Sequence, residues 1–245
     1  EMLKRLEFPA SWHSELHNYA GSLGIDFIST AFDPQSLAFL QTLNLPFYKV
    51  PSGEITNGPL LLAFARTGKD LILSTGMSTL GEIELALAVV AYGYCHDTDP
   101  GSLDDIWRFW STNEARLAIA NKITLLHCTS QYPTPMEEVN LKAMDTLASA
   151  FQVPVGYSDH TQGLVVPIAA VARGAVVIEK HFTLDRELPG PDHRASLEPG
   201  ELAEMVRQIR NIERALGDGN KRPQVSEWDT RQAARQQLMF AETVT

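Results

Sequence analysis

The sequence contains little cysteine. Its 245 residues include two, Cys95 and Cys128, which lie far apart in different contexts. Cys128 directly follows an apolar run, and we expect it to be a small core residue and not half of a disulfide. A chain that does not depend on disulfides is most simply placed in a reducing cytoplasm.

Positive charge and long apolar runs are also scarce. Twenty Lys and Arg residues face 30 Asp and Glu residues, for a net charge of −10, which argues against nucleic acid or an anionic membrane as partner. A small anionic substrate is still allowed, since a few local cations and hydroxyls can hold it.

No stretch approaches the ~20 apolar residues that span a bilayer. No signal peptide is visible, and because the chain begins at Glu1 without Met, we expect it to start partway into a longer product.

Short apolar runs rich in β-branched and aromatic residues recur along the chain. They are nearly continuous, as expected for parallel strands covered on both faces. Most starts are separated by enough residues for a strand, a loop and one helix. The six predicted strands are FIST at 27–30, FYKV at 47–50, LILS at 71–74, ITLL at 123–126, VPVGY at 153–157 and VVIE at 176–179.

Helix signals lie between these runs. Asn57 and Pro59 open a helix that ends before Gly68, and Thr79 with Glu82 forms a capping box. A last helix is expected at about 199–216. The pattern predicts an α/β fold of the TIM (β/α)8-barrel type, with six of eight βα units in this chain and two expected before residue 1. The partial barrel is predicted over 1–225, with a linker or helix at 226–245 and a helical insertion at 95–121 on the outside.

The residues that follow the predicted strands are unusually polar. In such barrels the active site lies at the carboxyl ends of the strands. One lysine, several hydroxyls and glycines that allow close backbone approach predict an anion site there, although strand-end Ser and Gly also form ordinary turns. The candidates are Thr30, Lys49, Ser52, Gly53, Ser74, Gly76 and Ser158.

Two histidines occupy matching positions after adjacent strands. His160 and His181 are one βα unit apart, and both could face the barrel mouth. Imidazole is a common ligand of divalent transition metals. Position alone leaves both metal binding and ordinary packing open. His127 is expected to be buried, and His193 to face solvent or substrate.

Seven segments taken together resemble the N-acetylneuraminate (sialic acid) synthase family, which includes the legionaminate and pseudaminate synthases. They occur in family order and cover almost the whole chain outside 95–121. The segments are FISTAFD, YKVPSGEITNGPLL, LILSTGMSTLGEIELA, LLHCTSQYPTP, VGYSDHTQG, VIEKHFTLDRELPGPDHRASLEP and ALGDG. The sixth favours the neuraminate and legionaminate branches without separating them.

The resemblance implies a condensation of phosphoenolpyruvate with an N-acetylated amino sugar, to give a nine-carbon 2-keto acid and phosphate. N-acetylmannosamine or a related 6-deoxy sugar is the expected acceptor. His160 and His181 would bind Mn²⁺ or Mg²⁺. Lys49 and Glu54 would be catalytic, with Glu54 placed to handle a proton. Phosphoenolpyruvate would contact Thr30, Lys49, Ser52, Ser74, Ser130 and Ser158, of which Ser130 stands where some relatives carry Asn. The sugar would contact Glu54, Tyr132 and Asp192.

The resemblance also implies parts that this sequence does not contain. The first two barrel strands of the family carry an acidic residue and a Lys-x-Gln segment. A C-terminal antifreeze-like domain lends an arginine to the partner subunit in a homodimer. We therefore expect little synthase activity and poor stability if residues 1–245 are the whole polypeptide.

Two other functions are kept open. One is a related enzyme that condenses phosphoenolpyruvate with a sugar phosphate; it needs a second basic cluster, for which Arg186 and Arg194 are the available candidates. The other is a catalytically inactive fragment that binds a sugar or an anion on the barrel scaffold. Phosphate release from phosphoenolpyruvate with each sugar and manganese separates the three.

Overall fold

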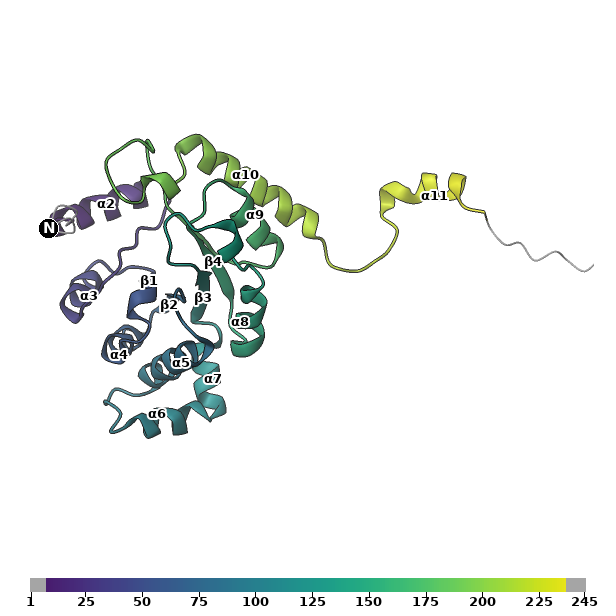
Figure 1. Cartoon of the computed structure of the whole chain (residues 1–245). Coiled ribbons are helices and arrows are strands. Elements are labelled where there is room, and N and C mark those ends of the chain that lie inside the picture. The colour runs from purple at the N-terminus through teal and green to yellow at the C-terminus, as the bar shows by residue number, and fades with distance from the viewer. Residues whose placement is uncertain (1–7, 237–245) are drawn as a thin grey trace, which may run out of the picture.

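A computed structural model of the chain describes residues 8–236. Five parallel strands form one sheet in the order β1-β2-β3-β4-β5, which is also their order in the sequence. They are β1 (Phe47–Val50), β2 (Asp70–Ser74), β3 (Ile123–Cys128), β4 (Val155–Asp159) and β5 (Ile178–Lys180). Helices lie around the outside of the curved sheet in an arc, so that sheet and helices form a half-barrel (Figure 1).

The helices follow the strands as in a βα barrel. In chain order they are α2 (Ala10–Ser22), α3 (Pro34–Gln41), α4 (Gly58–Arg66), α5 (Leu80–Cys95), α6 (Leu103–Trp110), α7 (Asn113–Ala120), α8 (Ala143–Phe151), α9 (Val165–Ala172), α10 (Pro199–Leu216) and α11 (Trp228–Ala234). Short 3-10 turns occur at η1 (Ser52–Glu54), η2 (Met136–Glu138), η3 (His193–Ala195) and η4 (Val225–Glu227). None of the helices between residues 8 and 236 is long and apolar enough to cross a membrane.

Helix ends fall where the sequence places them. Asn57 accepts a hydrogen bond from the Leu60 N–H at the start of α4, and the Thr79–Glu82 capping box is formed at the start of α5. Helix α10 ends at Gly217, whose φ of 65° favours glycine. The predicted insertion is helical: α6 and α7 lie outside α5, remote from the strand ends that carry the site (Figure 1).

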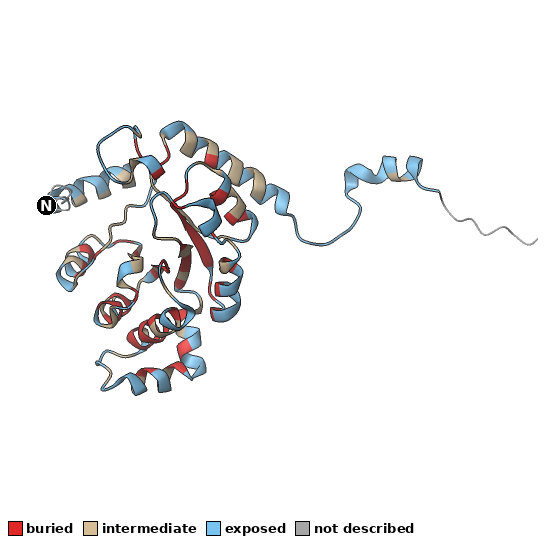
Figure 2. Ribbon diagram, in the orientation of Figure 1, coloured by how far each residue is buried: buried red, intermediate tan, exposed pale blue. Residues whose placement is uncertain are grey.

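Side chains alternate between the two faces of the sheet. One face packs against the helices and forms the core, with Tyr48, Val50, Leu71, Leu73, Leu125 and Tyr157 buried. The other face carries the polar strand-end residues. Figure 2 shows burial concentrated on the strands and on the helix faces turned toward them. Because successive side chains of a strand point to opposite faces, only every second residue of each strand can contribute to a site on one face.

The structure corrects one strand. Residues 27–30 were predicted as a strand, but they form no regular element; Phe27 packs against the core without joining the β1 ladder. Apolar and β-branched residues indicate that a segment is buried. A strand also needs backbone hydrogen bonds to a neighbouring strand, and this segment makes none. The sheet therefore has five strands among the described residues, and the prediction of six βα units is reduced to five.

The segment after α10 differs from the barrel. Residues 220–224 lead away from α10 without regular structure, and η4 and α11 lie apart from the sheet (Figure 1). The helix falls within 226–245, where a linker or helix was predicted; residues 237–245 of that range lie outside the described residues.

Candidate active site

A cavity of about 300 Å³ opens at the carboxyl ends of the strands. It gathers most of the side chains that the sequence singled out, from all five strands or the turns after them. Its lining is Lys49, Pro51, Ser52, Gly53, Ser74, Met77, Cys128, Ser130, Tyr132, Ser158, His160, Glu179 and His181.

Hydroxyl groups cover one wall of this cavity. The Gly76 N–H donates to Ser52 Oγ at 3.0 Å, and Ser52 Oγ lies 3.3 Å from Cys128 Sγ. A Cβ added at Gly76 would overlap Ser130 Oγ and stand 2.9 Å from Ser52 Oγ. The glycine is thus required for the two serines to lie this close to the backbone at residue 76.

Ser74 is the most informative of these residues. Its side chain is buried, and its Oγ is the one buried side-chain nitrogen or oxygen between residues 8 and 236 that has no hydrogen-bond partner. Leaving a buried hydroxyl unpaired costs about 1–3 kcal/mol. Because Ser74 lines the cavity, a ligand in the cavity is the natural partner for this hydroxyl.

Lys49 and Glu179 form an ion pair inside the cavity. The Lys49 Nζ lies 2.9 Å from Glu179 Oε2, and Glu179 Oε1 also accepts a hydrogen bond from Ser158 Oγ at 2.6 Å. Glu179 was not among the predicted site residues. Its signal in the sequence was a carboxylate at the end of the buried run VVIE, one position before the Lys180–His181 pair.

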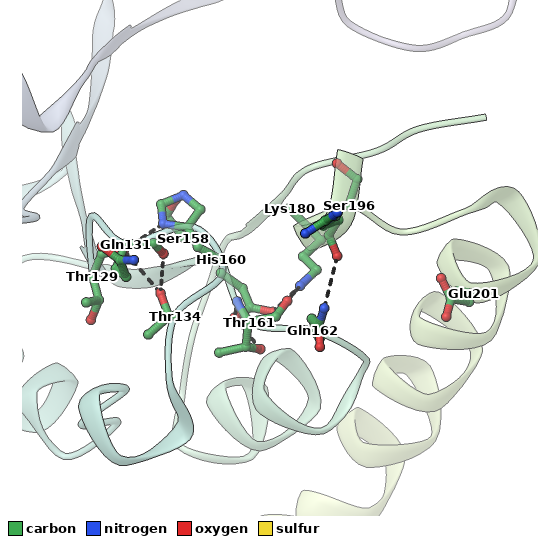
Figure 3. A network of polar contacts seen from close by, with 12 residues as sticks. Thr129, Gln131, Thr134, Ser158, His160, Thr161, Gln162, Lys180, Ser196 and Glu201 are labelled. Atoms are coloured by element: carbon green, nitrogen blue, oxygen red, sulfur yellow. Dashed lines mark hydrogen bonds and ion pairs between the residues drawn. The ribbon is translucent and has the colours of Figure 1, made fainter. Parts of the chain in front are cut away.

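His160 is held in one tautomer. Its Nδ1 lies 2.7 Å from the carbonyl oxygen of Thr129, which can only accept, so Nδ1 carries the proton. Nε2 then has a free lone pair, 3.5 Å from Ser158 Oγ. Burial is the main cause that lowers the pKa of His160, so the neutral ring is favoured. Figure 3 shows Thr129, Gln131 and Thr134 gathered beside His160.

Three rings lie together at the mouth. The His160 and His181 ring centres are 5.4 Å apart, and the Tyr132 ring lies 4.1 Å from His160 and 5.4 Å from His181. Burial is also the main cause that raises the pKa of Tyr132, with smaller effects from Cys128, Asp192 and Glu179, so the phenol keeps its proton.

The donor chemistry of the histidine pair suits a divalent metal. A ring whose Nδ1 is bound to a backbone carbonyl and whose Nε2 is free has the arrangement found in metal-ligating histidines. No group of three or more His, Cys, Asp or Glu able to hold a metal occurs in the described part of the chain. The two imidazoles would therefore leave positions open for other ligands.

Three predicted residues do not line the cavity. Glu54 accepts a hydrogen bond from Asn57 at 2.7 Å, and Thr30 lies in the irregular segment before α3. Asp192 lies in the loop before η3, close enough for its charge to affect Tyr132. Their predicted contacts with phosphoenolpyruvate and sugar stay predictions.

The other two histidines that follow predicted strands, His127 and His193, have structural contacts. His127, which was predicted to be buried, is half-buried, and its Nε2 donates to the Val139 carbonyl at 2.9 Å on the helix side of the sheet. His193 Nδ1 lies 2.7 Å from Thr183 Oγ1, and the His193 ring packs close to Gly190. His193 thus holds the loop that carries Asp192, instead of facing the cavity.

Fold and site together define an α/β half-barrel whose strand ends carry a cavity lined by hydroxyl groups, one lysine and a histidine pair. The family model that matches residues 1–221 is that of the NeuB family, and the chain belongs to it. The predicted resemblance to the sialic acid synthase family is confirmed.

Two curated relatives are similar over nearly all of this chain. An N,N'-diacetyllegionaminic acid synthase of Campylobacter jejuni is 47% identical over 239 residues, which is 98% of this chain and 65% of the relative. A human N-acetylneuraminate-9-phosphate synthase is 37% identical over 222 residues, which is 90% of this chain and 55% of the relative. The chain thus spans less than two thirds of the length of these relatives.

Solved structures share the fold. An N-acetylneuraminic acid (sialic acid) synthetase of Leptospira borgpetersenii, in complex with citrate, superposes with a TM-score of 0.78 at 34% identity, over 96% of this chain and 74% of that one. A truncated 3-deoxy-D-arabino-heptulosonate 7-phosphate synthase of Thermotoga maritima gives a TM-score of 0.65 at 18% identity, over 86% and 74%, and shares the fold alone. The predicted barrel class is supported; the count of eight units is not tested.

Proposed function

We propose that this chain forms the catalytic half-barrel of a synthase that condenses phosphoenolpyruvate with an N-acetylated amino sugar. The observation that carries the proposal is the unpartnered Ser74 hydroxyl in a cavity that also holds Lys49 and the histidine pair. The names of the relatives, which make legionaminic acid and N-acetylneuraminate 9-phosphate, support an amino-sugar acceptor.

The phosphate of phosphoenolpyruvate would bind at the hydroxyl wall. Lys49 supplies the positive charge, and Ser52, Ser74, Ser130 and Ser158, from the ends of neighbouring strands or the turns after them, supply hydroxyl donors. The ligand would take over the Lys49 and Ser158 contacts that Glu179 now makes. Glu179 would stay in the cavity as a hydrogen-bond acceptor.

The proposed reaction forms one carbon–carbon bond. C3 of the enol attacks the aldehyde carbon of the open-chain sugar, water adds at C2, and the tetrahedral intermediate expels phosphate by C–O cleavage. A divalent metal, Mn²⁺ or Mg²⁺, held by His160 and His181 would supply Lewis acidity toward the aldehyde oxygen. The protonated Tyr132 phenol, beside both rings, can donate a hydrogen bond to the sugar.

The cavity favours an unphosphorylated sugar. Lys49 is the one Lys or Arg in its lining, so the described residues supply a cation for one phosphate. Arg186, a candidate for a second basic cluster, is paired with Glu201, and Arg194 is exposed. Recognition of a sugar phosphate would need a second cation, which supports N-acetylmannosamine or a diacetylated 6-deoxy sugar as acceptor.

The test is phosphate release from phosphoenolpyruvate with manganese and one of three acceptors: N-acetylmannosamine, its 6-phosphate or the diacetylated 6-deoxy sugar. In a full-length protein that contains this chain, we expect release with an unphosphorylated sugar, a strongly raised phosphoenolpyruvate KM in Lys49→Ala and loss of metal-dependent turnover in His160→Ala or His181→Ala. Lys69→Ala is the matched control, because Lys69 bonds to Asn44 away from the cavity. Turnover with the 6-phosphate alone would favour the sugar-phosphate alternative. Phosphate or sugar binding without any turnover would support the inactive-fragment alternative.

A further inference from the structure

A buried ion pair joins the tips of β4 and β5. The Lys180 Nζ lies 2.7 Å from Asp159 Oδ2, and the two side chains are 3% and 0% exposed. Asp159 Oδ1 accepts hydrogen bonds from the N–H of Thr161 at 3.0 Å and from its hydroxyl at 2.9 Å. Lys180 also donates to the Thr161 carbonyl, and it extends toward Thr161 in Figure 3. All charges and polar groups of this cluster are therefore satisfied.

This cluster lies on the face of the sheet opposite to the cavity. Asp159 and Lys180 are partners in the β4–β5 register, as are Ser158 and Glu179 one position earlier. Ser158 and Glu179 line the cavity, so the alternation along each strand turns Asp159 and Lys180 toward the helices. The residues that follow them, His160 and His181, return to the cavity side. Asp159 and Lys180 thus touch neither the cavity nor anything bound in it.

We propose that the Asp159–Lys180 pair is a positioning device that sets the spacing of His160 and His181 for a shared divalent cation. The inference rests on the metal role given to the two histidines under the proposed function. The ion pair joins β4 to β5 at the positions directly before the two histidines. Thr161, which follows His160, bonds to both members of the pair, so the hydrogen-bonded cluster includes residues on both sides of His160. His160 is also fixed from its own side, by the Thr129 carbonyl at its ring and by the Thr134 N–H, which donates to its backbone carbonyl at 2.9 Å.

Stability alone does not explain such a pair. A buried ion pair gains little over well-packed apolar side chains of similar volume, because two charges must be removed from water. A charged pair differs from an apolar pair because its hydrogen bonds have a fixed direction. Lys180 donates to one carboxylate oxygen of Asp159 and to the carbonyl of Thr161. A directional contact at the strand tips restricts how far the two imidazoles can separate.

The experiment replaces the pair without leaving a lone buried charge. Asp159→Leu/Lys180→Met removes both charges but also the partners of the Thr161 N–H, hydroxyl and carbonyl, so it should lower the melting temperature. Lys180→Met alone leaves a charged carboxylate buried without its cation and should also lower it strongly. We expect Mn²⁺ affinity, measured by the EPR signal of free manganese, to fall about 10–100-fold in the double variant. The visible spectrum of bound Co²⁺ should also change. Lys180→Arg keeps the directional contact and should bind within a few-fold of the parent.

A matched control is Glu204→Leu/Arg207→Met, an exposed pair on α10 that should leave metal binding unchanged. If the apolar double variant does not fold, Asp159→Asn/Lys180→Gln carries the same test. Unaltered Mn²⁺ affinity and Co²⁺ spectrum in a folded double variant overturn the positioning role and leave the proposed function intact. Parent protein that binds no more Mn²⁺ than His160→Ala overturns the metal pair itself, and the positioning role with it.

Discussion

Lys49 on β1 and Glu179 on β5 form an ion pair at 2.9 Å although their strands are the two outermost of the sheet. A flat sheet of five strands would hold these residues about 19 Å apart, at four inter-strand spacings. The contact therefore shows that the sheet is strongly curved. It also places a carboxylate on the lysine that an anionic substrate needs.

Removing the charge of Glu179 should strengthen anion binding. Glu179→Gln keeps the shape of the side chain and a hydrogen-bond acceptor for Ser158, but it frees the charge of Lys49. We expect inorganic phosphate to bind about 3–10-fold more tightly, corresponding to about 1 kcal/mol. Isothermal titration calorimetry measures this directly. Glu213→Gln, which breaks an exposed pair with Arg210, is the control. Weaker phosphate binding in Glu179→Gln would argue against this role of the carboxylate.

Ser74→Ala should weaken ligand binding without lowering the stability of the fold. Since the Ser74 hydroxyl is buried without a partner, its removal should leave the free energy of unfolding unchanged or raise it by about 1 kcal/mol. The same change should weaken phosphate or phosphoenolpyruvate binding several-fold. Urea denaturation and calorimetry give the two quantities.

The neighbouring Thr75 provides the contrast for Ser74. Its buried hydroxyl donates to the Leu126 carbonyl at 2.9 Å, so Thr75→Val should cost about 1 kcal/mol of stability. Equal destabilisation by both substitutions would show that the Ser74 hydroxyl has a partner inside the protein.

Gly76→Ala should damage the hydroxyl wall. The added Cβ would overlap Ser130 Oγ and crowd Ser52 Oγ, and the rearrangement should cost about 1–3 kcal/mol of stability together with most of the anion affinity. Gly81→Ala, in the first turn of α5 with open space around it, should be neutral or stabilising. Melting curves of the two variants check the difference, and similar curves would falsify the packing argument.

The stability of the fold should fall in mildly acidic solution. Burial lowers the pKa of both His127 and His160 from the ordinary 6.5, so the folded state takes up fewer protons than the unfolded one in that range. The stabilising contribution is present above pH 6.5 and is lost as the pH falls through the lowered values. Denaturation between about pH 7 and pH 5.5 measures it. His127→Gln should reduce the slope; an unchanged slope would exclude His127 as a source.

The sequence predicted the parts of this structure that depend on local chemistry. Apolar runs located five strands, and the Thr79–Glu82 and Gly217 signals located helix ends, because burial and capping are decided within a few residues. Lys49, Ser52, Ser74, Ser158 and the two histidines were found because parallel strands bring their carboxyl ends to one edge.

The remainder depends on contacts between distant residues. Residues 27–30 carry the composition of a strand but not its pairing. The roles of Glu179 and of the Asp159–Lys180 pair follow from the curvature and register of the sheet, which single residues do not encode. Glu54 was placed near the sugar by resemblance; its carboxylate accepts a hydrogen bond from Asn57, and its sugar contact stays a prediction.

The curvature of the sheet also determines which part of the site forms first during folding. His160 and His181 require only β4 and β5, which are neighbours in sequence, so this part can form through a short loop closure. The Lys49–Glu179 contact joins residues 130 positions apart and requires all five strands to be in place. A folding chain would thus bring its two histidines together before the Lys49–Glu179 contact closes the cavity.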